Sequence, residues 1–275
     1  MTIVIQCTDQ VGLISSITTV LANAQLNIVS MREHVDEVKN QFFMRLEIND
    51  AGDDRSIQAK LTAVLPPGAA VHINPLPDKD VVVLVTKEHH CLADILVRNF
   101  YGTLGAKVKA VIGNYDVLAD ICNRFEIPFY HISHEGVTRQ DFEAQILQVI
   151  HKLAPDYLVL AKFMRILSPG FVGRFPTRII NIHHSFLPAF VGANPYKQAY
   201  ERGVKLIGAT AHFVSNELDE GPIIAQQIIP VSHTFTAADM MRAGREIETA
   251  VLANALKLVF EDRVFVFANK TIVFD

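Results

Sequence analysis

Hydrophobic positions follow two patterns along the first 75 residues, one typical of helices and one typical of strands. Apolar residues recur every three or four positions from Leu13 to Ala24, which is typical of a helix with one buried face. Other stretches carry the short runs of β-branched and aromatic residues that favour strands. We expect strands at 2–7, 27–35, 41–48 and 69–74, and helices at 13–24 and 55–64. This βαββαβ order predicts a small α+β, ferredoxin-like domain over residues 1–75.

A second pattern begins after residues 76–80, which lie in a stretch rich in proline and charge and predict a linker. Residues 81–85 form a continuous aliphatic run, typical of a strand buried on both faces of a parallel sheet. Further strands are expected at 107–112, 127–132, 157–161, 178–183, 206–214 and 223–228, helices at 91–99, 117–125, 139–153, 195–202 and 237–260, and a hairpin at 263–274. The alternation predicts an α/β, Rossmann-like, doubly wound domain over residues 81–275.

Composition narrows the class of protein. Half of the residues are hydrophobic, a fifth are charged, and the formal net charge is −4, so we expect a folded protein without a nucleic-acid or membrane-surface partner. The three cysteines are far apart in the chain and odd in number, which predicts neither a disulfide framework nor a metal cluster and fits a reducing cytoplasm. We also expect no signal peptide, and no apolar run of the sequence is long enough to span a membrane.

Candidate chemistry appears where the strand at 178–183 ends. Alternate side chains of a strand share a face, so Asn181 and His183 point the same way near its carboxyl end, where open α/β sheets bind ligands. An amide can hold a carbonyl oxygen, and an imidazole can donate to that oxygen or move a proton. Thr210 and His212 share a face of a later strand in the same manner. The spacing is also compatible with strands that merely carry satisfied polar residues.

The first domain resembles an ACT domain. The resemblance lies in residues 9–14 before the helix, in residues 26–29, and in the phenylalanine-containing strand at 41–48. It implies a domain that binds small effectors, often amino acids and here glycine or methionine, and that joins chains into a homo-oligomer. The implied effector-binding residues are Asp9, Gly12, Asn27 and Ile28. Free amides at a helix N-terminus attract a carboxylate, and a glycine lets it approach the backbone. Alternatively, Asp9 only caps the helix, Asn27 only makes the turn, and the domain only pairs chains.

The second domain resembles the formyltransferase fold shared by enzymes that use 10-formyltetrahydrofolate. Four segments carry the resemblance, at 161–168, 181–188, 209–214 and 218–224. An ACT domain ahead of this fold is the layout of the formyltetrahydrofolate deformylase family, to which segments 183–188 and 192–196 are also similar. The resemblance implies the catalytic residues Asn181, His183 and Asp219, with His212 as a further candidate that either orients Asp219 or the water, or is structural. It implies the substrate-binding residues Arg165, Leu167, Asn216 and Glu217.

One departure from the fold family bears on the reaction. In the ribonucleotide transformylases, a glycine-rich loop after the first strand holds the substrate phosphate, whereas residues 86–92 here contain no glycine and include Glu88. Such a loop is poorly suited to a phosphate dianion. Water then replaces the amine acceptor, which predicts hydrolysis of 10-formyltetrahydrofolate to tetrahydrofolate and formate, a one-carbon source for purine synthesis. The alternatives are a formyltransferase with an unrecognised amine acceptor, and a ligand-sensing regulatory protein with an inactive formyltransferase-like domain.

The family's catalytic set suggests roles for the residues. We expect Asp219 to be the general base, either directly or by holding the water and His183, with a pKa moved toward neutrality by partial burial. His183 would stabilise the oxyanion and return a proton to nitrogen, and Asn181 would donate to the same oxygen. We expect no metal, because the histidines form no metal-binding motif, and no cofactor, because the folate derivative is the substrate.

Overall fold

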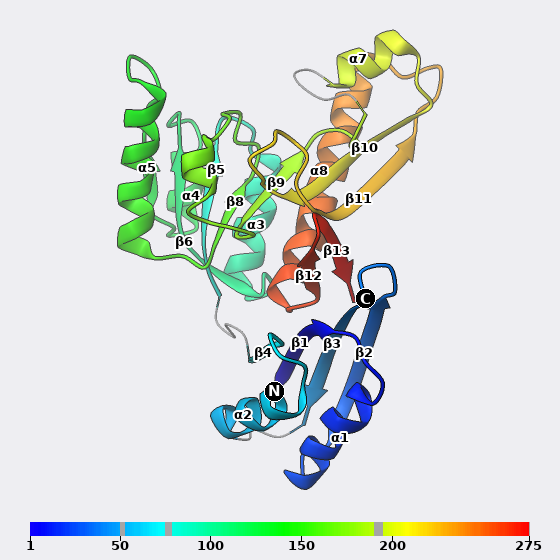
Figure 1. The fold of residues 1–275 in the computed structure, drawn as a ribbon. Helices are drawn as coiled ribbons and strands as arrows, with labels where there is room; N and C mark the ends of the chain where they lie inside the picture. Colours follow the sequence, from blue (N-terminus) through cyan, green and yellow to red (C-terminus); the bar gives the residue numbers. More distant parts are fainter. Residues whose placement is uncertain (50–52, 75–78, 190–194, 275) are drawn as a thin grey trace. The chain divides into compact units, whose positions relative to one another are not determined.

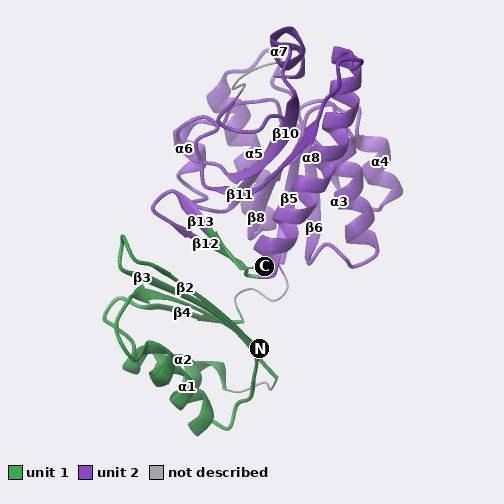
Figure 2. Cartoon of the chain, turned by 90° about the vertical axis from the view of Figure 1, so that its right-hand side faces the viewer, with its two compact units in different colours: residues 1–77, 262–265, 272–275 green, residues 78–261, 266–271 purple. Residues whose placement is uncertain are grey.

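The computed structural model describes residues 1–49, 53–74, 79–189 and 195–274. The chain forms two compact units, coloured separately in Figure 2. Unit 1 comprises Met1–Pro77, Asp262–Phe265 and Ile272–Asp275, and unit 2 comprises Asp78–Glu261 and Val266–Thr271. Of the expected linker, residues 76–78 lie outside the described residues, and Lys79 and Asp80 already begin a strand. No helix in the described part of the chain is both long and apolar enough to cross a membrane.

Unit 1 contains a four-stranded antiparallel sheet with two helices on one side (Figure 2). Its strands are ordered β2-β3-β1-β4, which confirms the ferredoxin-like prediction. The apolar faces of both helices pack on the inward residues of β1 and β3, so that Ile5, Ile17, Met44 and Leu61 are fully buried. The elements are β1 (Thr2–Thr8), α1 (Leu13–Asn23), β2 (Ile28–Asp36), β3 (Gln41–Ile48), α2 (Asp54–Val64) and β4 (Ala70–Ile73).

Unit 2 is built on a seven-stranded sheet of order β11-β10-β9-β8-β5-β6-β7 (Figure 1). Strands β5 to β9 run parallel, and β10 and β11 are antiparallel additions at one edge. The doubly wound prediction is therefore confirmed. The elements are β5 (Lys79–Val85), α3 (His90–Phe100), β6 (Ala106–Gly113), α4 (Ala119–Arg124), β7 (Phe129–His131), α5 (Arg139–Leu153), β8 (Tyr157–Leu160), α6 (Pro169–Val172), β9 (Ile179–His183), α7 (Pro195–Arg202), β10 (Leu206–Phe213), β11 (Ile223–Pro230) and α8 (Ala237–Phe260).

The sheet order explains where a ligand can enter unit 2. Within this sheet, the chain passes from β5 outward to β6 and β7, and then returns to form β8 on the other side of β5. The residues of β5 from Val82 to Val85 are completely buried, because helices cover both faces of the central strands. In open α/β sheets, the carboxyl ends of the strands beside such a reversal form the binding crevice. Both β8 and the neighbouring β9 end at this edge.

The chain closes with a hairpin of β12 (Val264–Phe267) and β13 (Lys270–Val273), as the sequence predicts. Residues 266–271 of this hairpin belong to unit 2. There the side-chain amide of Asn269 donates to the carbonyl oxygen of Glu220 at 3.0 Å, and the hydroxyl of Thr271 donates to the carbonyl oxygen of Ile223. The turn of the hairpin therefore supports the loop that connects β10 with β11.

Candidate active site

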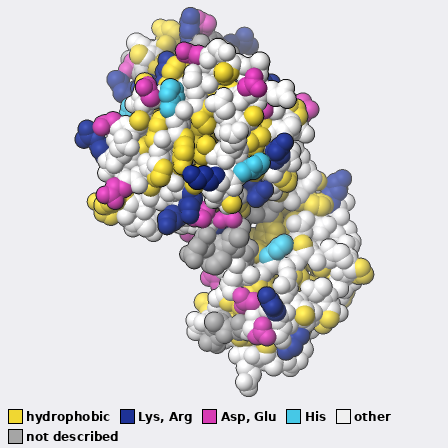
Figure 3. Space-filling model, turned by 90° about the vertical axis from the view of Figure 1, so that its left-hand side faces the viewer, with side chains coloured by type: hydrophobic (Ala, Val, Ile, Leu, Met, Phe, Trp, Pro, Cys, Tyr) yellow, Lys and Arg dark blue, Asp and Glu magenta, His cyan; other side chains and the backbone are white. Residues whose placement is uncertain are grey.

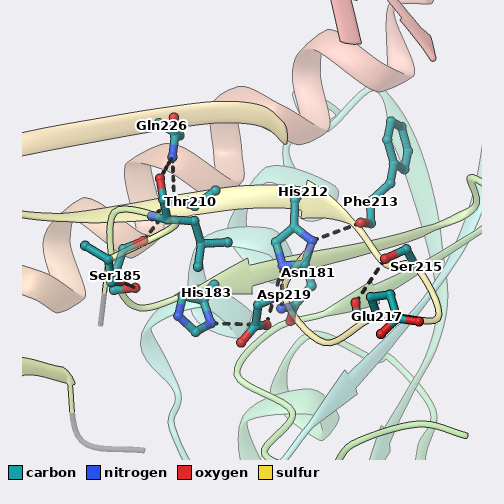
Figure 4. A network of polar contacts seen from close by, with 12 residues as sticks. Asn181, His183, Ser185, Thr210, His212, Phe213, Ser215, Glu217, Asp219 and Gln226 are labelled. Atoms are coloured by element: carbon teal, nitrogen blue, oxygen red, sulfur yellow. Dashed lines mark hydrogen bonds and ion pairs between the residues drawn. The ribbon is translucent and has the colours of Figure 1, made fainter. Parts of the chain in front are cut away.

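Two neighbouring strands bring four polar side chains to one face of the sheet. In the antiparallel register of β9 and β10, Asn181 lies opposite His212, and His183 lies opposite Thr210. Residues directly opposite in an antiparallel pair project from the same face. The two pairs that the sequence predicts separately therefore form a single group (Figure 4).

His212 fixes the orientation of the Asn181 amide. Nδ1 of His212 lies 2.9 Å from the carbonyl oxygen of Phe213 and donates to it, so Nε2 accepts from Nδ2 of Asn181 at 3.1 Å. Burial lowers the pKa of His212 despite this hydrogen bond, which favours the neutral imidazole that the arrangement requires. The second N–H of the amide is not used by His212 and can serve a ligand oxygen. The expected link from His212 to Asp219 is longer, at 3.9 Å.

His183 and Asp219 form the charged centre of the group. Nδ1 of His183 lies 3.3 Å from Oδ1 of Asp219, and the His183 side chain is only 7% exposed. Nε2 of His183 is buried and has no hydrogen-bond partner within the described part of the chain. A histidine that donates from Nδ1 to a carboxylate keeps a lone pair on Nε2. That nitrogen can therefore take a proton from a reacting water.

The carboxyl group of Asp219 is more acidic than the sequence predicts. Burial acts to raise the pKa of Asp219, but the hydrogen bond with His183 and the electrostatic interactions with His183, His212 and His184 lower it below the ordinary value of 3.8. The expected shift toward neutrality is therefore wrong, because the surrounding imidazoles stabilise the carboxylate more than burial destabilises it. An ionised Asp219 is better suited to hold His183 than to accept a proton itself.

The loop that carries Asp219 is held close to the end of β10. The N–H of Phe213 donates to the carbonyl oxygen of Pro222 at 2.9 Å, and the Ser215 hydroxyl donates to the carbonyl oxygen of Glu217 at 3.0 Å. A Cβ atom on Gly221 would lie 1.7 Å from the carbonyl oxygen of Phe213, so this position accepts only glycine. The close return of the loop places Asp219 beside His183.

A cavity of about 270 Å³ opens beside the group. On the face of unit 2 drawn in Figure 3, hydrophobic side chains gather in a patch bordered by lysine or arginine and histidine side chains. The segment at 163–167, which we call the apolar wall, lines the cavity together with polar side chains of β9, β10 and the loop to Asp219. This combination suits a flat heteroaromatic ring held next to a reacting carbonyl. The structure brings all the predicted catalytic and substrate-binding residues to this cavity, namely Arg165, Leu167, Asn181, His183, His212, Asn216, Glu217 and Asp219.

The apolar wall is anchored at both of its ends. The N–H of Met164 donates to the hydroxyl of Thr86 at 2.8 Å, just after β5. At the other end, Glu143 of α5 accepts from the N–H of Ser168 at 2.7 Å and also pairs with the Ser168 hydroxyl. Glu143 is 7% exposed, so these hydrogen bonds are shielded from water. The segment between the two anchors therefore has a defined backbone against which a ligand can bind.

The sequence prediction missed a buried charged cluster that reaches the same cavity through Lys162, formed by His90, Lys162, Tyr196 and Glu248. Glu248 of α8 is 1% exposed and accepts from the Tyr196 hydroxyl at 2.7 Å, from Nε2 of His90 at 2.7 Å and from Nζ of Lys162 at 3.2 Å. Burial acts to raise the pKa of Glu248, but these three partners lower it to about 2. The sequence does carry a signal, because Glu248 lies at helical spacing from the apolar residues of α8 and must be paired if buried.

Within the described residues, one group offers side chains that could bind a metal ion. It consists of His90, Cys91 and Glu248, whose ligand atoms all lie within 4.8 Å of one another. However, the ammonium group of Lys162 lies 3.2 Å from the Glu248 oxygen that also faces His90, and it would repel a cation at that place. We therefore assign no metal to this group.

The predicted effector residues lie at two separate places in unit 1. Gly12 is the N-cap of α1, with a φ of +91° and no side-chain cap, so the alternative in which Asp9 caps the helix is wrong. The backbone N–H of Asp9 donates instead to the carbonyl oxygen of Asn40 at 3.0 Å. Asn27 and Ile28 follow the other end of α1, a helix of 11 residues and therefore roughly 16 Å long. A small amino acid cannot contact both pairs within one chain.

Comparisons with known proteins agree with this two-part organisation. Residues 79–256 match the family model described as formyl transferase, and residues 1–66 match the ACT domain. Formyltetrahydrofolate deformylase from Escherichia coli (strain K12) is 53% identical over 267 residues, which cover 97% of this chain and 95% of that protein. The chain belongs to the formyltetrahydrofolate deformylase family.

Solved structures support the same placement. The crystal structure of a formyltetrahydrofolate deformylase from Pseudomonas syringae pv. tomato matches with a TM-score of 0.94 at 38% identity, covering 100% of this chain and 94% of that chain. Glycinamide ribonucleotide transformylase 1 from Symbiobacterium toebii matches with a TM-score of 0.69 at 30% identity, covering 72% of this chain and 95% of that chain. Membership of the deformylase family confirms the resemblance that the sequence motifs indicate.

Proposed function

We propose that this chain hydrolyses 10-formyltetrahydrofolate to tetrahydrofolate and formate. The observation that carries the proposal is the meeting, around one cavity, of Asn181, His183 and Asp219 with the anchored segment at 163–167. The first three residues supply the chemistry for a carbonyl, and the segment supplies a wall for a ring system. Relatives that match almost the full length of this chain are named formyltetrahydrofolate deformylase.

The geometry suggests how hydrolysis proceeds. Nε2 of His183 removes a proton from a water, whose oxygen attacks the formyl carbon, and the free N–H of Asn181 donates to the oxyanion that forms. His183 then returns the proton to the folate nitrogen as the bond from carbon to nitrogen breaks. Because the pKa of Asp219 is lowered, we assign Asp219 the second of its two expected roles, that of holding His183. Removing one oxyanion donor typically costs about a hundredfold or more in rate.

The remaining cavity residues are candidates for binding the pterin ring. Leu167 belongs to the apolar wall, Arg165 is exposed beside it, and Asn216 and Glu217 lie on the loop that leads to Asp219. The anchored backbone between Met164 and Ser168 can present N–H and C=O groups to the edge of a flat ring. We assign these four residues to substrate binding.

The loop after β5 supports water, rather than an amine, as the acceptor. Nζ of Lys87 lies 3.9 Å from the centre of the Tyr115 ring, and Glu88 forms an ion pair of 3.0 Å with Arg245. The charged side chains of this loop are therefore engaged by other residues of unit 2. Together with the absence of glycine from residues 86–92, this pairing leaves the loop poorly suited to bind the phosphate of an acceptor.

The proposal is tested by incubating the purified chain with 10-formyltetrahydrofolate in an amine-free buffer. We expect formate and tetrahydrofolate in equal amounts, measured by NMR and by absorbance. The second candidate function, a formyltransferase, is favoured by the match to glycinamide ribonucleotide transformylase. Formate release that requires an added amine, or its replacement by an N-formyl amine, would contradict the hydrolase proposal.

We further propose that the ACT domain joins chains into a homo-oligomer and binds glycine or methionine. The two pairs of candidate residues, Asp9 with Gly12 and Asn27 with Ile28, are separated in one chain, so a site that uses both needs two chains. We expect a change in the hydrolysis rate when glycine or methionine is added, and heat release in calorimetry. A flat response to both would leave the domain as an assembly device.

The three buried free cysteines support the proposal of a cytoplasmic location.

A further inference from the structure

Lys162 has a backbone conformation that lysine seldom adopts. It follows β8 directly, has a φ of +61°, and is 8% exposed. A side chain is disfavoured in this left-handed region, and a buried lysine requires a partner for its charge. Glycine at this position would avoid both the backbone strain and the burial of a charge. The backbone of this position therefore does not explain the lysine side chain.

The ammonium group of Lys162 pairs with the buried carboxylate of Glu248. Nζ lies 3.2 Å from Oε2 of Glu248, while Tyr196 and His90 satisfy the other acceptor positions of that carboxylate. A protonated primary amine presents the same ammonium group to a protein. The carboxylate of Glu248 is therefore suited to pair with a protonated primary amine. In this chain, the ammonium group of Lys162 takes that position.

Lys162 connects this ion pair with the cavity of the reacting group. Lys162 lines the same cavity as Asn181 and His183. The ring of His184 lies 5.2 Å from that of His183 and 6.3 Å from that of Tyr196, so one residue separates the charged cluster from the catalytic imidazole. Burial and then the charge of Lys162 lower the pKa of His184 to about 4, which keeps a second positive charge away from the cavity.

We propose that the ammonium group of Lys162 occupies the place of an amine acceptor, excludes amines from the cavity, and thereby reserves the formyl group for water. This inference rests on the proposed hydrolysis. An entering ammonium ion would meet a like charge and would find Glu248 already paired. Water carries no charge and pays neither cost. Lys162 is thus a specificity-determining residue that need not take part in the chemical step.

Removing the side chain should open the cavity to amines. In Lys162→Gly, a small primary amine enters as its ammonium ion and pairs with Glu248. It loses one proton to the solvent, its neutral nitrogen then attacks the formyl carbon, and the bond from that carbon to the folate nitrogen breaks. One amine proton passes to the folate nitrogen, which gives an N-formyl amine and tetrahydrofolate. Glycine accepts the left-handed backbone, and alanine does so elsewhere in this chain, since Ala154 has a φ of +45°. Lys162→Ala is therefore a second variant.

The experiment compares the wild-type chain, Lys162→Gly and Lys162→Ala with 10-formyltetrahydrofolate and an excess of glycinamide or methylamine. Mass spectrometry measures the ratio of N-formyl amine to formate. We expect this ratio to rise about tenfold or more in the variants, the scale of discrimination that a pocket contact provides. Ala154→Gly is the matched control, because it replaces another left-handed residue at an exposed position, and its ratio should equal that of the wild type.

A purely structural role for Lys162 would lower the formation of both products and leave their ratio unchanged. That result in either folded variant overturns the proposal while the hydrolase function stands. A wild-type chain that releases no formate in amine-free buffer overturns the proposed function instead. The two failures are therefore distinguished by the chain in which each is observed.

Discussion

Replacing His183 by alanine is expected to lower kcat by about a thousandfold, within the range usual for a general acid or base, with a smaller change in KM. The reason is the geometry of the imidazole. Nδ1 is 3.3 Å from Asp219, and Nε2 is buried without a partner among the described residues. Alanine removes the atom that moves the proton and leaves the apolar wall of the cavity unchanged. Initial rates against folate concentration, followed by formate release, measure both constants.

Matched variants separate this role from general damage. His131→Ala removes an exposed imidazole at the end of β7 and should keep full activity. Asp219→Asn keeps the size of the side chain but loses the charge that orients His183, so its kcat should also fall. Residues that act as a unit are not additive, and the double variant should be little slower than His183→Ala alone. Full activity in His183→Ala, or strictly additive losses, would show that the two side chains do not form the catalytic unit.

Replacing Glu248 by alanine is expected to lower the free energy of unfolding by about 3–5 kcal/mol, the cost of removing one partner from a buried ion pair. Lys162, 8% exposed, and the largely buried His90 would lose the carboxylate that pairs with both. Urea unfolding followed by circular dichroism measures the change. Glu246→Ala, at an exposed position of the same helix, is the control and should change stability by less than about 0.5 kcal/mol. An equal effect of the two substitutions would contradict the importance of the pair.

The same carboxyl group makes stability depend on pH in a defined window. The pKa of Glu248 is about 2 in the folded chain and 4.5 ordinarily, so its contribution is complete above 4.5 and is lost as the pH falls toward about 2. At about 1.4 kcal/mol for each pH unit, this difference corresponds to roughly 3 kcal/mol. Unfolding curves of the wild type should therefore weaken across this window by about that much more than those of Glu248→Gln. Parallel pH profiles for the two proteins would exclude Glu248 as the source.

Most elements of the fold follow from hydrophobic spacing alone. The predicted helices at 139–153, 195–202 and 237–260 have the bounds observed for α5, α7 and α8. The first and last of them carry long apolar stripes and begin at threonine caps. The pairing of the strands, in contrast, does not follow from hydrophobic spacing. That β10 and β11 run antiparallel at the edge of the parallel sheet depends on packing between residues far apart in the chain.

In the candidate site, too, some features follow from the local sequence and others depend on tertiary packing. The shared face of Asn181 and His183 follows from the period of a strand, but their meeting with His212 depends on the register of β9 against β10. The pKa of Asp219 could not be predicted, because burial and the imidazoles act in opposite directions. The pair of Lys162 with Glu248 joins a residue after β8 to the middle of α8, and no local pattern marks lysine for burial.

The closing hairpin has a consequence for truncated versions of the protein. The match to the formyl transferase family ends at residue 256, before α8 is complete and before the hairpin begins. A catalytic fragment cut at that boundary would lose Asn269, which donates to the carbonyl oxygen of Glu220, the neighbour of Asp219. Fragments meant to retain the native geometry of Asp219 should therefore extend through residue 271, and a fusion partner is better joined beyond the hairpin than within it.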